Sequence, residues 1–150
     1  MILHELHDRI RTVEVFFKAA QAAAGHFIEV CRADPTHLDP TGLRVRDVRD
    51  CLKDLEDTYL IRAYAVFETA LRDYWDACIR PGRHTHPRTE HLIDGVAARC
   101  MIGPAELTAV QTIRTYRNWL LHGGPARSKI RLGHARQWMC RFMMRLPGAW

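Results

Sequence analysis

The sequence predicts an all-α fold, a bundle of about five helices that forms a single domain over residues 1–150. Apolar residues recur every three or four positions along most of the chain, which is the helical period. Prolines and glycines fall between these periodic segments, and no segment alternates apolar and polar residues long enough to predict a strand. With 150 residues and a hydrophobic content of 47%, the chain can bury one core without disulfides or a metal.

The first half of the chain predicts three helices. The first spans residues 2–31, where the helical spacing of apolar residues continues and no proline intervenes. Two prolines and a glycine in residues 34–42 end it. A second, shorter helix then begins at Val45, and a third runs from about residue 55 to residue 79. The first helix cannot bury its apolar side without the rest of the chain, so residues 34–42 are not predicted to separate two domains.

The second half predicts three more helices. A loop that begins at Pro81-Gly82 precedes a helix from about residue 88 to residue 100. The next helix covers residues 104–122, since it starts with a proline, which suits a first helical position, and is followed by glycine, which suits the residue that ends a helix. A last amphipathic helix is predicted near residues 130–146.

Charge is unevenly distributed along the chain. The formal net charge is +5, but residues 107–150 contain eight Lys and Arg and no Asp or Glu. This segregation predicts that an anionic partner meets the C-terminal third. The alternative is that arginine is merely the preferred cation of this sequence and that the charges are spread around the helices.

The composition favours a cytoplasmic protein that does not bind membranes. No apolar run approaches the roughly 18 residues needed to span a bilayer, and charged residues near the start leave no apolar stretch of a signal peptide. The five cysteines lie far apart, each among apolar neighbours. This pattern predicts buried thiols in place of disulfides.

The most informative segment is Arg117-Asn118-Trp119-Leu120-Leu121-His122, which two glycines follow. Arginine offers a planar fork of donors that fits phosphate oxygens, and histidine has an unperturbed pKa near cellular pH. Together these two side chains predict phosphodiester chemistry. The structural alternative is a histidine that caps carbonyl groups at the end of a helix.

Helical geometry divides this motif between two sides of its helix. Residues four apart are neighbours, so Asn118 and His122 share a row with Arg114, and Asn118 can orient His122. Arg117 lies about 140° around the helix from His122 and interrupts an apolar stripe, where a charge needs a partner. Glu68 interrupts the apolar stripe of the third predicted helix in the same way. We therefore expect Glu68 and Arg117 to face each other.

With these features, residues 50–146 resemble the HEPN superfamily, whose hallmark is an arginine, often a polar residue after it, and a histidine a few positions later. Arg117-Asn118-x-x-x-His122 fits this form, and residues 62–68 resemble the glutamate-bearing helix of RiboL-PSP-type HEPN proteins. The resemblance implies a helical bundle that dimerises with its two motifs near the two-fold axis. Many members cleave RNA without a metal, so the resemblance implies this activity here. Other members are catalytically silent modules that bind a protein or a nucleotide, and this is the alternative.

The resemblance also implies roles for individual residues. His122 is the expected general acid or base, Arg117 the charge stabiliser, Asn118 the group that orients His122 or a phosphate, and Glu68 the group that holds Arg117. No cofactor or metal is expected. The residues expected to guide the RNA backbone are Arg114, Arg127, Lys129 and Arg131.

The resemblance also implies how the protein is regulated and what its biological role is. The family implies a toxin or a phage-defence effector, with an antitoxin or another regulatory protein as partner. Some HEPN toxins carry a tyrosine two residues after the histidine, where a nucleotidyltransferase modifies them, but this chain has Gly124 there. That mode of control is therefore not expected.

A second group of polar residues contains the side chain types that bind metals. His84, His86 and His91 lie close in sequence to Glu90. The first two fall in a predicted loop beside arginines, and the spacing matches no structural zinc site. No metal site is therefore predicted.

Overall fold

The computed structural model describes residues 3–79, 81, 87–125 and 127–150. These residues form a bundle of α-helices without a β-strand, so the predicted all-α class is confirmed. A 3-10 helix, Pro35–Thr41, follows the first α-helix, and one π-helical turn, Trp75–Ile79, extends the second. The α-helices are α1 (Leu3–Ala33), α2 (Val45–Tyr74), α3 (Thr89–Arg99), α4 (Pro104–His122) and α5 (Leu132–Met143).

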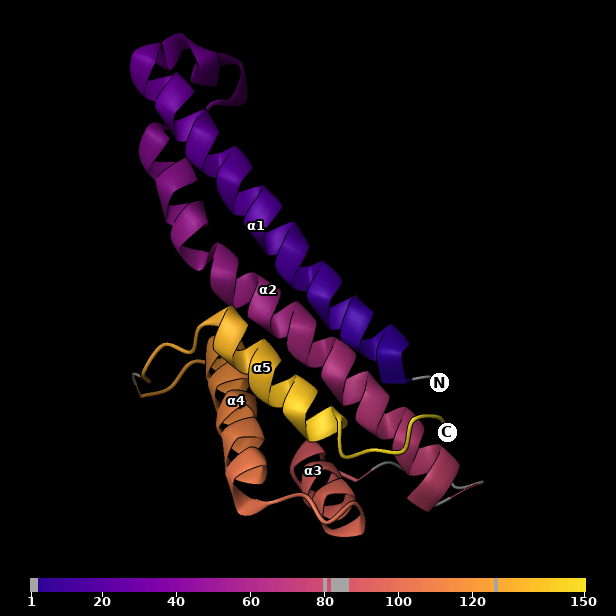
Figure 1. Ribbon diagram of the computed structural model, residues 1–150. Coiled ribbons are helices and arrows are strands. Elements are labelled where there is room, and N and C mark those ends of the chain that lie inside the picture. The colour runs from indigo at the N-terminus through magenta and orange to yellow at the C-terminus, as the bar shows by residue number, and fades with distance from the viewer. Residues whose placement is uncertain (1–2, 80, 82–86, 126) are drawn as a thin grey trace.

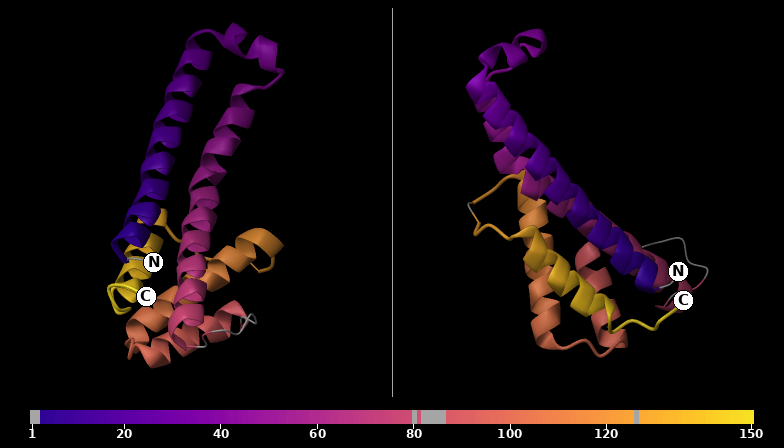
Figure 2. Two further views of the ribbon diagram at one scale, coloured as in Figure 1. Left: turned by 90° about the vertical axis from the view of Figure 1, so that its right-hand side faces the viewer. Right: turned by 45° about the horizontal axis from the view of Figure 1, so that its top comes forward.

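A long antiparallel hairpin of α1 and α2 organises the bundle, and α3, α4 and α5 pack around one end of it (Figure 1). The other end of the hairpin projects beyond the bundle, and we call residues 18–52 the arm. In the view of Figure 1 α1 lies on one side of α2 and α4 on the other, and the left view of Figure 2 shows α4 crossing α2. Helix α2 is therefore the scaffold to which every other α-helix docks.

The predicted boundary between the second and third helices is wrong. The second and third predicted helices are one helix of 30 residues, Val45–Tyr74. The apolar spacing in fact continues through Val48, Leu52 and Leu55, and no proline or glycine interrupts it. The charged residues between Leu52 and Leu55 are exposed, so they do not oppose the helix.

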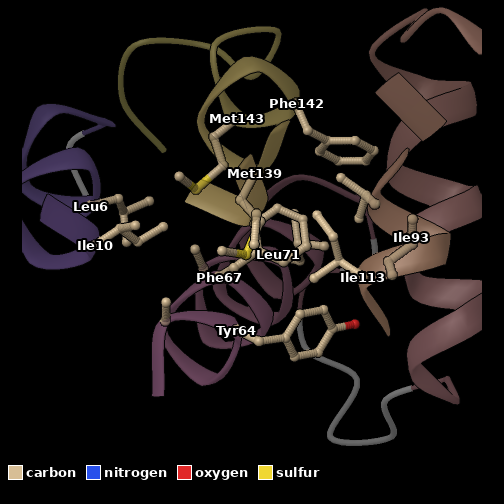
Figure 3. Packing of buried hydrophobic residues seen from close by; sticks show 14 of the residues in the cluster. Leu6, Ile10, Tyr64, Phe67, Leu71, Ile93, Ile113, Met139, Phe142 and Met143 are labelled. Carbon is tan, nitrogen blue, oxygen red and sulfur yellow. The ribbon is translucent and has the colours of Figure 1, made fainter. Parts of the chain in front are cut away.

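The hydrophobic core lies where α2 meets the other α-helices, away from the arm (Figure 3). Phe67 of α2 and Phe142 of α5 meet edge to face, with ring centroids 5.6 Å apart. Both rings are fully buried. Other buried members from the five helices include Leu6, Ile10, Tyr64, Leu71, Ile93, Ile113, Met139 and Met143.

The thiol environments depart from the prediction. All five cysteines are free, but only Cys31 is buried, while Cys51 and Cys78 are exposed. Cys51 lies on the part of α2 that belongs to the arm, and Cys78 lies in the short π-helical turn; both thiols are on sides that no described helix covers. Among the described residues, no helix combines the length and the apolar character that a membrane span requires.

Gly95 allows α3 to pack closely against the indole ring of Trp75, because a Cβ at this position would lie 2.5 Å from Cζ3 of that ring. The Gly95→Ala variant is expected to lower the free energy of unfolding by about 1–2 kcal/mol. Displacing Trp75 costs about 1–3 kcal/mol, which outweighs the gain of at most about 1 kcal/mol from replacing a helical glycine. Urea denaturation measures the change.

Gly25 in α1 supplies the matched control for this variant. A Cβ at Gly25 meets nothing within 4 Å outside its own helix backbone. The Gly25→Ala variant is therefore expected to raise the free energy of unfolding by about 0.5–1 kcal/mol. If both variants gained stability equally, the proposed steric role of Gly95 would be wrong.

Candidate active site

The motif occupies the last two turns of α4, as predicted. His122 is the final residue of the helix, and Gly123 follows with a φ of 74°, in the left-handed region that favours glycine. The N–H group of Gly123 donates to the Trp119 carbonyl oxygen over 2.8 Å. The sequence predicted this helix end correctly, because proline and glycine mark both of its limits.

Arg117 extends from α4 towards α2, and its side chain is 26% exposed. Its Nη2 atom lies 3.9 Å from Oε2 of Glu68, so the predicted facing of these two residues is confirmed. Its Cζ atom also lies 5.5 Å from the centre of the Tyr64 ring, which is within the range of a cation–π contact. A half-buried guanidinium is thus held between a carboxylate and an aromatic face.

Glu68 joins three helices. Its Oε1 atom accepts hydrogen bonds from Nη2 of Arg72, over 2.6 Å, and from Oγ1 of Thr89 in α3, over 2.8 Å. Its Oε2 atom is the one that faces Arg117 of α4. The carboxylate is only 16% exposed, so its contacts fix the mutual positions of α2, α3 and α4 at this site.

These contacts set the protonation of the site. Burial raises the pKa of Glu68, but the hydrogen bonds from Arg72 and Thr89 and the charges of Arg72 and Arg117 outweigh burial, so the pKa lies below its ordinary value. Burial, with a smaller effect of the Glu68 charge, raises the pKa of the Tyr64 hydroxyl. At neutral pH the site therefore holds an ionised Glu68 beside a neutral Tyr64.

Asn118 contacts a different residue from the one expected. Its Oδ1 atom accepts a hydrogen bond from Nη1 of Arg117 over 3.0 Å. Among the described residues, no hydrogen bond joins Asn118 to His122, whose side chain is exposed to solvent at the helix end. In this structure Asn118 therefore orients Arg117, and His122 is left accessible.

Arg114 lies one turn before Asn118 and borders a groove between α3 and α4. Its Nε atom donates to Oε1 of Gln111 over 2.7 Å, and its Nη2 atom lies 3.4 Å from Oε2 of Glu90. Arg127 lines the same groove, whose volume is about 410 Å³. The structure thus brings two of the predicted RNA-binding arginines to one concave surface.

The other two predicted RNA-binding residues are held by acids of α2. Nη1 of Arg131 lies 2.9 Å from Oε2 of Glu56, and Nζ of Lys129 lies 3.5 Å from Oδ2 of Asp57. Glu56 also accepts a hydrogen bond from the backbone N–H of Leu132, the first residue of α5, over 3.0 Å. Lys129 and Arg131 therefore fasten the segment before α5 to α2.

Most of the Lys and Arg side chains in the acid-free C-terminal third form ion pairs, as Lys129 and Arg131 do. Its cations pair mainly with acids from earlier in the chain, so much of the charge segregation is neutralised within the fold. Among the described residues, Arg127 and Arg141 form no ion pair, and Arg141 packs 4.9 Å from the Trp138 ring. The pairs are Arg114–Glu90, Arg117–Glu68, Lys129–Asp57, Arg131–Glu56, Arg136–Glu14 and Arg145–Glu106.

Sequence reasoning missed Arg72 and Thr89. Arg72 follows Glu68 by four residues, and this spacing places an acid and a base side by side on a helix, so a signal for it was present. Thr89 reaches Glu68 only because α3 docks against α2. No local pattern predicts that contact.

The structure describes only part of the histidine group near Glu90. His84 and His86 lie outside the described residues, and His91 is exposed. Within the described parts of the chain, no three His, Cys, Asp or Glu residues gather in a way that fits a metal ion.

Comparison with known proteins does not identify this chain: no family model, no curated protein and no solved structure matches it. A half-buried guanidinium and an exposed imidazole on one helix end supply an anion-binding group and a proton carrier.

Proposed function

We propose that this chain is a metal-independent endoribonuclease of HEPN type that acts as a homodimer. The observation that carries the proposal is Arg117, held against α2 by Glu68 and five residues before the exposed His122 at the end of α4. An arginine on a helix surface is ordinary. Burying the charge of Arg117 in an apolar stripe costs free energy, even with a carboxylate facing it and an amide oxygen that accepts its hydrogen bond. This cost supports a functional role for the side chain.

The proposed reaction is attack of a ribose 2′-hydroxyl on the adjacent phosphorus. The 2′ oxygen forms a bond to phosphorus and gives its proton to a base, while the bond to the 5′ oxygen breaks and that oxygen gains a proton. His122 serves as the proton carrier, and Arg117 stabilises the charge that develops on the phosphate oxygens. The products are a 2′,3′-cyclic phosphate and a 5′-hydroxyl.

A dimer follows from the directions of the two side chains. Arg117 and His122 lie about 140° apart around the helix, so one helix does not readily bring both to one phosphate. A second motif related by a two-fold axis supplies the missing group to each site. Leu121 beside His122 is 47% exposed, and an apolar side chain at this position suits a contact between two motifs.

Cleavage of mixed cellular RNA in the presence of EDTA tests the proposal. The expected result is fragmentation with 2′,3′-cyclic phosphate ends, because the 2′-hydroxyl is the nucleophile. Products with a 5′-phosphate would contradict the mechanism. A folded but inactive protein would favour the alternative, a silent HEPN-like module that binds a protein or a nucleotide.

A toxin or phage-defence role belongs to the same proposal. A nonspecific ribonuclease damages its own host, so an antitoxin or another regulatory protein is the partner that such an activity requires. Gly124 replaces the tyrosine that is modified in some HEPN toxins, which favours control by a bound partner.

The pairing of the cations predicts which arginine guides RNA. The Arg127→Ala variant is expected to reduce the slope of log affinity against log salt by about 0.7, the value for one phosphate contact on a single strand. The Arg131→Ala variant is expected to change the slope less, because Arg131 is engaged with Glu56. Fluorescence anisotropy with single-stranded RNA over a salt series, in a His122→Ala background, measures both. Equal slopes for the two variants would contradict this assignment.

A further inference from the structure

The groove between α3 and α4 carries charges of both signs. Helix α3 contributes the carboxylates of Glu90 and Asp94, while Arg114 of α4 and Arg127, which follows that helix, contribute guanidinium groups. The volume of about 410 Å³ lies within the range of roughly 300–1,000 Å³ that is usual for small-molecule sites. The groove therefore has the size and the charges for a ligand that both donates and accepts hydrogen bonds.

Gln111 fixes the positions of the charged groups in the groove. Its Nε2 atom donates to Oδ1 of Asp94 over 2.8 Å, and its Oε1 atom accepts a hydrogen bond from Nε of Arg114 over 2.7 Å. One amide side chain thus ties a carboxylate of α3 to a guanidinium of α4. Side chains that are already ordered lose less conformational entropy when a ligand binds.

Several atoms of these groups remain available to a ligand. Among the described residues, Oδ2 of Asp94 and Oε1 of Glu90 have no protein partner, and Arg127 forms no ion pair. Carboxylate oxygens accept hydrogen bonds, whereas guanidinium groups only donate them. The groove therefore offers acceptors from α3 beside donors from Arg114 and Arg127.

The groove lies next to the motif. Thr89 of α3 donates a hydrogen bond to Glu68, the carboxylate of the motif site, and the next residue, Glu90, lies 3.4 Å from Arg114. The first turn of α3 thus contacts the motif site and the groove at once. Arg114 precedes His122 by eight residues, which is about 12 Å along the helix axis. A single RNA strand bound at the motif reaches the groove over this distance.

Guanine matches the groove better than the other bases of RNA do. Its Watson–Crick edge presents two adjacent donors, N1–H and the N2 amino group, to the paired acceptors of a carboxylate. The next positions along the base, O6 and N7, are acceptors that arginine binds with two hydrogen bonds. Adenine, cytosine and uracil lack two adjacent donors. The donors and acceptors of guanine thus complement carboxylates that lie beside Arg114.

We infer that this groove binds a guanine of the RNA and makes cleavage selective for it. Asp94 and Glu90 accept hydrogen bonds from N1–H and the N2 amino group, Arg114 donates to O6 and N7, and Arg127 binds an adjoining phosphate. The inference rests on the proposed ribonuclease function and deepens it, because it names the substrate class. That class is single-stranded RNA, whose unstacked bases enter such a groove.

Cleavage of short single-stranded RNAs in EDTA tests the inference. An adenosine oligomer with one guanosine is expected to be cleaved about 10–100-fold faster than the all-adenosine oligomer. The Asp94→Asn variant replaces Oδ2 with a donor, keeps an oxygen for Gln111, and is expected to lose most of this preference. Equal cleavage of both RNAs by wild type, or an undiminished preference in Asp94→Asn, would overturn the inference.

The matched control is Asp54→Asn. Asp54 is an exposed aspartate of α2 outside the groove, and the substitution changes the net charge by the same amount. The Asp54→Asn variant is expected to keep the full guanosine preference. A loss equal to that of Asp94→Asn would show that net charge, not a base contact, sets the preference.

Inosine separates a base contact from a structural role of Asp94. Inosine lacks only the N2 amino group of guanosine, so wild type is expected to cleave the inosine oligomer more slowly than the guanosine oligomer. The Asp94→Asn variant is expected to cleave the two at similar rates, because the acceptor of that amino group is gone. A variant that discriminates as strongly as wild type would overturn the assigned contact.

Binding measurements distinguish failure of this inference from failure of the proposed function. Fluorescence anisotropy with the same RNAs, in a His122→Ala background, is expected to show the guanosine preference without cleavage. Fragmentation without base preference would overturn the guanine groove and leave the ribonuclease. A preference in binding without cleavage by wild type would support the groove and reject the ribonuclease. Binding of GMP, with no preference among the RNAs, would assign the groove to a free nucleotide and overturn the inference.

Discussion

The His122→Ala variant is expected to cleave RNA about 10²–10⁴-fold more slowly than wild type, which is the range that general acid–base catalysis contributes. The imidazole is exposed at the end of α4, so its removal leaves no cavity and no buried group without a partner. The measurement is the initial rate of RNA cleavage in EDTA. Because the fold is retained, a loss of rate reports on chemistry.

His134 provides the control for this variant. It is an exposed histidine on α5, in the same cation-rich third of the chain, but it lies outside the motif. The His134→Ala variant is expected to cleave RNA at the wild-type rate. Equal rates for wild type and His122→Ala would rule out the proposed enzyme.

Mixing two inactive variants tests whether each site draws on both protomers. Arg117→Ala and His122→Ala are each expected to be nearly inactive. In a mixed dimer, one site takes both altered residues and the other takes both intact ones. Half of the dimers are mixed, so about a quarter of the wild-type activity is expected to return. No recovery in the mixture would show that each site lies within one protomer.

The Glu68→Ala variant is expected to lower the free energy of unfolding by about 2–4 kcal/mol, because it leaves Arg72 and Arg117 partly buried without their carboxylate. These side chains are 30% and 26% exposed, so water offsets part of the cost. The variant also loses the acceptor of the Thr89 hydroxyl. Urea denaturation at neutral pH measures the change, and a loss below about 0.5 kcal/mol would contradict this role.

The pH dependence of stability distinguishes the contribution of the Glu68 charge from the contribution of its side-chain shape. Because the pKa of Glu68 is lower in the folded state, its stabilisation is present above the ordinary value of 4.5 and is lost as the pH falls through the folded-state pKa. The Glu68→Gln variant keeps the shape without this titration. The difference in unfolding free energy between wild type and Glu68→Gln is therefore expected to narrow in acid. A constant difference would show that the charge has no stabilising effect.

Local patterns were sufficient to predict the fold class and much of α4. The limits of α4 follow from a proline and a glycine, and the facing of Glu68 and Arg117 follows from two charges that interrupt apolar stripes. The predicted division of α2 into two helices was wrong, because only charged, exposed residues lie between Leu52 and Leu55. Exposed charges do not end a helix that lacks proline and glycine.

The contacts of the remaining site residues depend on how distant helices dock. Lys129 and Arg131 have the composition of an RNA-binding segment, but Glu56 and Asp57 engage them from more than 70 positions earlier. Asn118 had two neighbours within reach on its helix, and the half-buried guanidinium is the one it contacts. Sequence spacing identifies candidate partners, whereas the packed helices decide among them.

Glu56 also bears on the order in which the molecule assembles. It accepts the first N–H of α5 from 76 residues away, and Asp57 accepts the Tyr116 hydroxyl from 59 residues away. The α1–α2 hairpin needs only a short loop closure, whereas these contacts close much longer ones. Docking of α4 and α5 is therefore expected to follow the hairpin. Until then their apolar sides stay uncovered, and the chain is most open to aggregation and proteolysis in that interval.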